Sequence, residues 1–141
     1  MANAYLTDAQ TSKRMKAVRL KGTAPERIMR AMLRQLRIRF RSQVAALPGR
    51  PDFVLPDLRV AIFIHGCFWH RHAGCPRATT PVRNKELWAR KFELNRSRDR
   101  RSAKLLARTG WRVMILWECE VRSAARLHRR LEVLKRWAAG E

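Results

Sequence analysis

The three cysteines of the chain and one of its four histidines stand at positions that a single fold could bring together. Three thiolates with one imidazole make a closed tetrahedral site of the kind that holds a structural zinc ion. The set consists of Cys67, His72, Cys75 and Cys119. Cys67 follows the apolar run 59–64 and Cys119 follows the run 111–117, so parallel pairing of the two runs would place both cysteines at one sheet edge. The sequence therefore predicts a structural Zn²⁺ site.

The number of cysteines also favours metal binding, because an odd number does not suit a disulfide framework and the cytoplasm is reducing. Two alternatives remain. Cys67 and Cys119 could nevertheless each be an ordinary buried apolar residue. His65 and His70 also lie close enough in the sequence to replace His72 as the imidazole ligand.

A second group of residues suits hydrolysis of a phosphodiester bond, which needs a metal held by a carboxylate, a base for water and stabilisation of charge at the phosphate. Asp52 begins a short strand that leads into the apolar run 59–64, and a carboxylate there is a natural ligand for a hard cation. His70 can serve as the general base, because imidazole titrates near neutrality. Each residue has a plainer interpretation, since Pro-Asp pairs are common in turns and His70 could be a further zinc ligand or a surface residue.

Two adjacent aromatic residues, Phe68 and Trp69, fall between the histidines of the segment 65–70. Neighbouring side chains of a loop do not both turn inward easily, so we expect at least one to be exposed. An exposed aromatic ring can wedge between base pairs. The alternative is that both rings anchor the loop by packing in the core.

The balance of charge indicates a polyanionic partner. The chain has 32 Lys plus Arg against 11 Asp plus Glu, a net charge of +21, and a surface this basic usually meets nucleic acid. An anionic membrane surface is the alternative. No apolar run is long enough to span a bilayer, and residues 1–12 lack the apolar stretch of a secretory signal. The sequence therefore predicts a cytoplasmic protein, with nucleic acid rather than a membrane as the expected partner.

Hydrophobic periodicity predicts one α/β domain with the element order α-β-β-β-α-β-α. Helices are expected at 23–37, 84–108 and 123–138, and strands at 38–44, 52–55, 59–64 and 111–117. Thr23 and Glu26 suit a helix start, because the first can cap free amides and the second complements the positive helix end. The middle helix would be the crossover that makes the last two strands parallel. Residues 1–22, with a short helix expected around 12–18, form a basic arm, and residues 23–141 form the domain.

Four motifs follow one another in the chain. They are Leu47-Pro48-Gly49-Arg50-Pro51-Asp52-Phe53, then Phe63-Ile64-His65-Gly66-Cys67-Phe68-Trp69-His70, then Gly110-Trp111-Arg112-Val113, and Trp117-Glu118-Cys119. Together they resemble the very short patch repair (Vsr) DNA mismatch endonucleases, over most of the chain. The resemblance implies the fold of type II restriction endonucleases, in which helices flank a mixed central sheet. It also implies an enzyme that nicks one strand of duplex DNA 5′ to the thymine of a T:G mismatch.

The resemblance further implies roles for individual residues. Asp52 corresponds to the aspartate that binds the catalytic Mg²⁺, and the backbone carbonyl of Ile64 corresponds to a second contact with that ion. His70 corresponds to the catalytic base and His65 to a histidine near the scissile phosphate. Glu26 corresponds to a glutamate that holds metal-bound water.

The remaining implied roles concern zinc and DNA. The family's zinc ligands correspond to Cys67, His72, Cys75 and Cys119. The side chains that grip the DNA or intercalate beside the mismatch correspond to Met15, Phe68, Trp69 and Trp88. In the family the mismatch arises when 5-methylcytosine deaminates, so a DNA cytosine methyltransferase and repair proteins are expected functional partners of a monomeric enzyme that acts at the bacterial nucleoid.

Two other functions stay open at this point. The chain could be a restriction-type or less selective DNA nickase of the same fold, because specificity depends on loops and on the arm. It could also be a non-catalytic zinc-bearing DNA-binding module, in which Asp52, Glu26 and His70 would be incidental.

Overall fold

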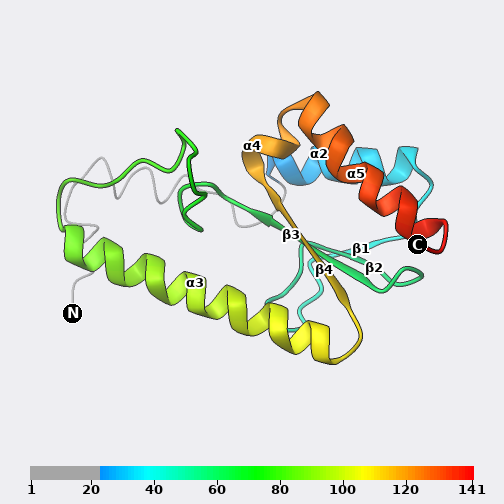
Figure 1. Ribbon diagram of the computed structural model, residues 1–141, viewed down its shortest axis with the longest axis horizontal. Coiled ribbons are helices and arrows are strands. Elements are labelled where there is room, and N and C mark those ends of the chain that lie inside the picture. The colour runs from blue at the N-terminus through cyan, green and yellow to red at the C-terminus, as the bar shows by residue number, and fades with distance from the viewer. Residues whose placement is uncertain (1–22) are drawn as a thin grey trace.

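A computed structural model describes residues 23–141, in which four helices and a four-stranded sheet make a mixed α/β arrangement (Figure 1). The predicted arm 1–22, with its short helix and Met15, lies outside the described residues. Within residues 23–141 none of the helices combines the length and the apolar character needed to cross a bilayer. The predicted order of elements is confirmed, with one additional short helix.

The strands lie in the order β1-β2-β3-β4 across the sheet. Their bounds are β1 Arg41–Ser42, β2 Phe53–Leu55, β3 Val60–His65 and β4 Arg112–Trp117. β2 pairs antiparallel with both β1 and β3, whereas β3 and β4 pair parallel. The sheet is therefore mixed, as expected.

The parallel pair of β3 and β4 positions the functional residues. Pairing runs without interruption from Val60 opposite Arg112 to His65 opposite Trp117. Both strands end at the same edge of the sheet, and the segments that contain Cys67 and Cys119 continue from there. The parallel pairing on which the zinc prediction depended is confirmed.

The strand predicted at 38–44 is much shorter in the structure. Only β1 forms, and directly after it the backbone turns to the left-handed region at Gln43, whose φ is 51°. Ile38 and Phe40 still pack against the hydrophobic core. The prediction was right about the place of this strand and wrong about its length.

The hydrophobic core lies on one face of the sheet, under the first and last helices. Helix α2 (Ala24–Gln35) begins where predicted, and the Thr23 hydroxyl accepts a hydrogen bond of 3.3 Å from the Glu26 amide. Met29 and Leu33 of α2 are fully buried. Helix α5 (Ala124–Ala138) completes the same core with three leucines: Leu127, Leu131 and Leu134.

The long crossover helix α3 (Lys85–Arg108) covers the other face of the sheet. Phe63 and Ile115, which point away from the main core, border a small cavity together with Asp99 and Ser102 of α3. The N-terminal half of α3 extends past the sheet, along the loop 66–81 (Figure 1). Trp88 and Phe92 are buried in that half.

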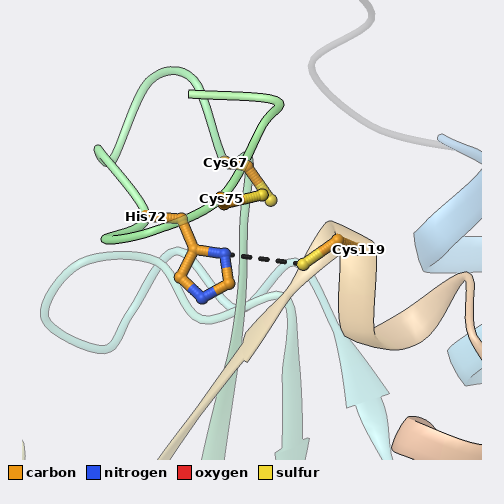
Figure 2. Close-up of side chains that lie close together, drawn as sticks. All are labelled: Cys67, His72, Cys75 and Cys119. Carbon is orange, nitrogen blue, oxygen red and sulfur yellow. Dashed lines mark hydrogen bonds between the residues drawn. The ribbon is translucent and has the colours of Figure 1, made fainter. Parts of the chain in front are cut away.

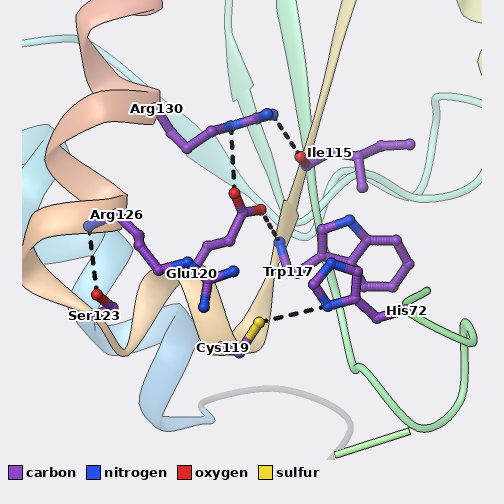
Figure 3. A network of polar contacts seen from close by, with 8 residues as sticks. All are labelled: His72, Ile115, Trp117, Cys119, Glu120, Ser123, Arg126 and Arg130. Atoms are coloured by element: carbon purple, nitrogen blue, oxygen red, sulfur yellow. Dashed lines mark hydrogen bonds and ion pairs between the residues drawn. The ribbon is translucent and has the colours of Figure 1, made fainter. Parts of the chain in front are cut away.

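A short helix, α4 (Glu118–Val121), follows β4 directly and was not predicted. It is too short to show a hydrophobic period. The Trp117 amide donates a 3.0 Å hydrogen bond to the Glu120 carboxylate, and Arg130 of α5 donates one of 2.7 Å to the Ile115 carbonyl (Figure 3). Arg130 also lies 4.0 Å from Glu120. These contacts fix the end of β4, and with it Cys119, against α5.

Candidate active site and metal centre

A pocket of about 470 Å³ opens at the end of β3, where that strand enters the loop 66–81. It is lined by Gln43, Gly49, Arg50, Asp52, Phe63, Ile64, His65, His70 and Asp99. Asp52, His65 and His70, which the sequence predicts as catalytic, therefore share one pocket. Glu26 joins them through a hydrogen bond from Gln43.

Asp52 stands immediately before β2 and reaches across to β3. One of its carboxylate oxygens accepts a 2.7 Å hydrogen bond from the Ile64 amide, and the other accepts a 3.4 Å bond from the Gln43 side chain. Burial raises the pKa of Asp52 above its ordinary value, and these two hydrogen bonds oppose the rise. A nearby cation would favour the ionised form of such a carboxyl group. Ile64, predicted to offer its carbonyl to a metal ion, is thus in direct contact with Asp52 through its amide.

Glu26 lies in the first turn of α2 and is almost completely buried, with 4% of its surface exposed. Its carboxylate accepts a hydrogen bond from the side-chain amide of Gln43. A buried carboxylate is rare unless it has a partner. The structure thus places Glu26 in one hydrogen-bonded chain with Gln43 and Asp52.

His70 is paired with a carboxylate that the sequence reasoning missed. Its Nδ1 lies 2.6 Å from an oxygen of Asp99, which projects from α3. A carboxylate at Nδ1 favours the tautomer that carries its proton there, so Nε2 becomes the proton acceptor. Asp99 is the only acidic residue in the basic stretch 96–108, and this exception to the surrounding charge is the signal that could have identified it.

His65 is stacked against His70 and buried. The two ring centroids lie 3.8 Å apart with an angle of 9° between the planes, and His65 retains 6% of its surface exposed. Burial and the neighbouring His70 lower the pKa of His65 to about 4. His65 is therefore a neutral hydrogen-bonding group at physiological pH.

The stacking also decides what these imidazoles can bind. Nitrogen atoms of His65 and His70 and an oxygen of Asp99 all lie within 4.8 Å of one another, close enough for a metal site. However, an imidazole nitrogen binds a metal ion through a lone pair that lies in the plane of its ring. An ion between two stacked rings would lie outside both planes, so these two imidazoles cannot share one ion. In this arrangement the group suits proton transfer rather than shared metal binding.

A second cluster brings together the four predicted zinc ligands (Figure 2). The sulfur atoms of Cys67, Cys75 and Cys119 and a ring nitrogen of His72 all lie within 4.8 Å of one another. The Cys119 sulfur is 3.5 Å from Nδ1 of His72. His72, rather than either of the other nearby histidines, is the imidazole of this cluster.

The cluster fits a soft or borderline metal ion. It offers three sulfur donors and one nitrogen donor, the combination found in structural zinc sites. Burial raises the pKa of the Cys67 thiol to about 12, so this thiol would ionise at neutral pH only beside a cation. The neighbourhood also orients the donors, because the Cys67 amide donates a 3.1 Å hydrogen bond to Glu118 and the ring of His72 stacks on Trp117 at 4.2 Å.

The predicted DNA-contacting aromatics form one packed group between the loop and α3. Phe68 lies 5.3 Å from Trp69, 5.5 Å from Trp88 and 5.3 Å from Phe92, measured between ring centroids. Trp69 also contacts Trp88 at 5.8 Å. Phe68 and Trp69 are half-buried and Trp88 is buried. The two neighbours thus both turn toward α3, contrary to the geometric expectation that one would point outward.

Arg71 ties this loop together. Its guanidinium donates hydrogen bonds to the carbonyl groups of Phe68, Ala78 and Thr79, at 3.3, 3.2 and 2.9 Å. The same group lies 4.3 Å from the ring centroid of Phe92. The loop that contains His70 and His72 is therefore fastened both to itself and to α3.

Comparison with known proteins places this arrangement in a family. A sequence model described as DNA mismatch endonuclease Vsr matches residues 3–76. The DNA mismatch endonuclease Vsr of Escherichia coli is 42% identical over 135 residues, which are 94% of this chain and 86% of that protein. The type II nicking enzyme V.XorIIP of Xanthomonas oryzae is 44% identical over 117 residues, 83% of this chain and 85% of the relative. The chain belongs to the Vsr family.

The Vsr match covers the half of the chain that supplies most of the pocket. Residues 3–76 include Glu26, Asp52, His65 and His70. Another relative, the type II nicking enzyme V.NmeAIP of Neisseria meningitidis, is 36% identical over 129 residues, 89% of this chain and 91% of its own length. The resemblance seen in the sequence motifs is thereby confirmed at the level of the family.

Two residues of this Vsr-family pocket escaped the sequence analysis, Gln43 and Asp99. Each acts through a neighbour from a different element, so no local motif marks it. Gln43 lies just after β1 and bridges carboxylates from α2 and from the residue before β2, whereas Asp99 reaches from α3 to the loop 66–81.

Proposed function

We propose that this Vsr-family protein is a DNA mismatch endonuclease that nicks one strand of a duplex 5′ to the thymine of a T:G mismatch. The observation that carries the proposal is the single pocket in which the half-buried Asp52 carboxylate and the His70–Asp99 pair face the same space. These are the groups that metal-assisted hydrolysis of a phosphodiester bond requires. The names of the relatives, a DNA mismatch endonuclease and nicking enzymes, support DNA as the substrate and cleavage of one strand.

The residues around Asp52 fit a magnesium ion. Asp52 and the backbone carbonyl of Ile64 would bind the ion, and Glu26 would hold one of its water molecules. All these donors are oxygen atoms, which Mg²⁺ prefers. A cation bound beside Asp52 would also lower the raised pKa of its carboxyl group. When bound, the ion supplies electrostatic stabilisation of the charge that develops on the phosphate.

Proton transfer falls to His70. Asp99 would accept a hydrogen bond from Nδ1–H and fix the ring, so that Nε2 can take a proton from the water molecule that attacks the phosphorus. His65 stacks on the same ring and limits its rotation. Because His65 is neutral, it offers a hydrogen bond near the scissile phosphate without adding a charge.

The second cluster would hold a structural Zn²⁺ bound by Cys67, His72, Cys75 and Cys119. Four protein ligands leave no position open for water, so this metal has no part in the chemistry. Its role is to join the loop 66–81 to the end of β4 and so to fix the position of His70, which lies between two of the ligands in the sequence.

Recognition of the mismatch is assigned to the aromatic group and the arm. Phe68 and Trp69 would wedge beside the T:G pair, with Trp88 packed behind them, while Met15 and the rest of the arm 1–22 grip the duplex. A mismatched step opens more easily than a paired one, so a wedge favours it. The T:G pair itself would come from deamination of 5-methylcytosine made by a DNA cytosine methyltransferase. The enzyme would act as a monomer in the cytoplasm, at the nucleoid, before other repair proteins.

A nicking assay on three duplexes tests this function. The duplexes differ only in carrying T:G, T:A or C:G at one position. We expect Mg²⁺-dependent cleavage of one strand, 5′ to the thymine, on the T:G duplex alone. Equal nicking of T:G and T:A would assign the protein to less selective nickases, and binding without any nicking would make it a DNA-binding module.

A further inference from the structure

Gln43 occupies an unusual position in the pocket, because its side-chain nitrogen faces two carboxylates at once. Nε2 donates one hydrogen bond to Glu26 and another, of 3.4 Å, to Asp52. Each of the two hydrogen atoms of the amide nitrogen can therefore serve a different carboxylate. Glu26 comes from α2 and Asp52 from the segment before β2, so Gln43 joins two elements.

The backbone of Gln43 is held as firmly as its side chain. The Gln43 amide donates a 3.0 Å hydrogen bond to the Asp52 carbonyl, which continues the antiparallel pairing of Ser42 with Phe53. The residue nevertheless has a φ of 51°, a conformation that residues other than glycine adopt uncommonly. Strain of this kind persists where the surrounding contacts demand it, and it gathers at functional sites.

We propose that Gln43 is a positioning residue that sets the affinity of the Asp52–Glu26 carboxylate pair for a divalent cation. The inference rests on the proposed function, in which those carboxylates serve a magnesium ion. Gln43 does not contact the substrate or the ion. It acts by holding the two carboxylates in place before the ion arrives.

Glutamine suits this position because its amide is a hydrogen-bond donor without a charge. Two neighbouring carboxylates repel each other when both are ionised. The amide nitrogen of Gln43 donates a hydrogen bond to each of them and so holds them together. A lysine or arginine would do the same but would also cancel the negative charge that attracts the cation. A neutral donor preserves that charge, so the site stays ordered and still favours a divalent ion.

Binding of Mn²⁺, measured by the electron paramagnetic resonance of the free ion, tests this inference without DNA and without turnover. The full-length, zinc-loaded protein is compared with Gln43→Met, which keeps the length of the side chain and removes the donor. We expect the dissociation constant for Mn²⁺ to rise about 10- to 100-fold, the usual effect of losing a residue that orients metal ligands. Gln35→Met, at the exposed end of α2, is the matched control and should bind Mn²⁺ like the unaltered protein.

Gln43→Asn tests the effect of the side-chain length separately from that of the backbone conformation. Asparagine tolerates a positive φ better than most residues, but its amide is one methylene shorter and cannot bridge both carboxylates. We expect it to weaken Mn²⁺ binding as well, and the Mg²⁺ concentration for half-maximal nicking should rise by the same factor while the maximal rate changes little. An Mn²⁺ dissociation constant unchanged in either variant, with or without a lower melting temperature, would overturn the inference.

Asp52→Ala distinguishes failure of this inference from failure of the proposed function. If Asp52→Ala and the unaltered protein bind Mn²⁺ equally, the pocket is not the cation site, and the proposed function fails together with the role of Gln43. If Asp52→Ala loses the ion and Gln43→Met retains it, only the role of Gln43 is wrong.

Discussion

At the scale of single residues, the candidate catalytic side chains of the pocket are each held by a partner. His70 is hydrogen-bonded to Asp99, and Asp52 is held by the Ile64 amide and by Gln43. The candidate catalytic residues Asp52 and His70 were predictable, because sequence motifs mark both. Their orienting partners were not, because Gln43 and Asp99 belong to other elements and their distances depend on the folded chain.

The His70–Asp99 pair leads to the first prediction. His70→Ala should lower the single-turnover nicking rate by roughly two to four orders of magnitude, and the residual rate should rise with pH as hydroxide replaces the missing base. Asp99→Asn should also lower the rate, because asparagine can hold the imidazole in the wrong tautomer. Binding of the T:G duplex should change little in both. Asp57→Asn is the control, since that acid is exposed and pairs with Arg39; if it harmed nicking as much as Asp99→Asn, the role of Asp99 would be wrong.

At the scale of elements, the long periodic segments were predictable and the short ones were not. The ends of α3 and α5 and the parallel pairing of β3 with β4 match the expectation closely, since each follows from a sustained pattern. The strand predicted at 38–44 ends early at Gln43, which has a positive φ, and α4 has too few residues to show a period. The parallel pair itself could be predicted, and it brings Cys119 beside the loop that contains Cys67.

The same pairing predicts that Cys119→Ser disrupts a metal site formed largely by a distant loop. The variant should lose its bound zinc, and its melting temperature should fall by roughly 10 °C or more. A structural zinc contributes directly to the free energy of folding. A loss of about 3 kcal/mol in that free energy lowers the melting temperature by roughly 10 °C in a domain of this size. Metal analysis and thermal unfolding check both, with the exposed His128→Asn as control. Unaltered protein without zinc, or Cys119→Ser with unchanged zinc and stability, would refute the site.

The contact between the loop 66–81 and α3 leads to a prediction about discrimination. Phe68→Ala and Trp69→Ala should each reduce the preference for T:G over T:A more than they reduce general affinity for DNA, because a wedge gains most at a step that opens easily. Competition binding with the two duplexes measures the ratio. Trp111→Ala, at the opposite end of the parallel strands, should leave the ratio unchanged. Equal losses on both duplexes would mean that the rings only pack the loop against α3.

At the scale of the whole molecule, the dominant feature is the net charge of +21. Composition alone indicated a polyanion but left nucleic acid and an anionic membrane open. Membership of the Vsr family favours DNA. The fold could be predicted as a mixed α/β domain, whereas the depth of the pocket could not, because it depends on how α3 and the loop 66–81 pack across the sheet.

This charge predicts a steep dependence of DNA binding on salt. The logarithm of affinity should fall linearly with the logarithm of salt concentration as neutralised phosphates release counterions. Contact with about six to ten phosphates would weaken binding by roughly three to five orders of magnitude between about 50 and 200 mM salt. A fluorescence titration on a matched duplex at several salt concentrations gives the slope, and a nearly flat line would contradict a DNA-binding surface.

We propose that the DNA strand is cut in the pocket that contains Asp52. Asp52→Ala, assayed in a single turnover at saturating enzyme beside a binding titration in Ca²⁺, tests this proposal most directly. Losing the carboxylate should abolish the metal-dependent chemistry, while DNA binding, which rests on many basic contacts, should stay intact or tighten slightly. We expect no detectable nicking of the T:G duplex by this variant, together with near-normal affinity for it. Nicking by Asp52→Ala at the unaltered rate would contradict the proposal and place the active site elsewhere.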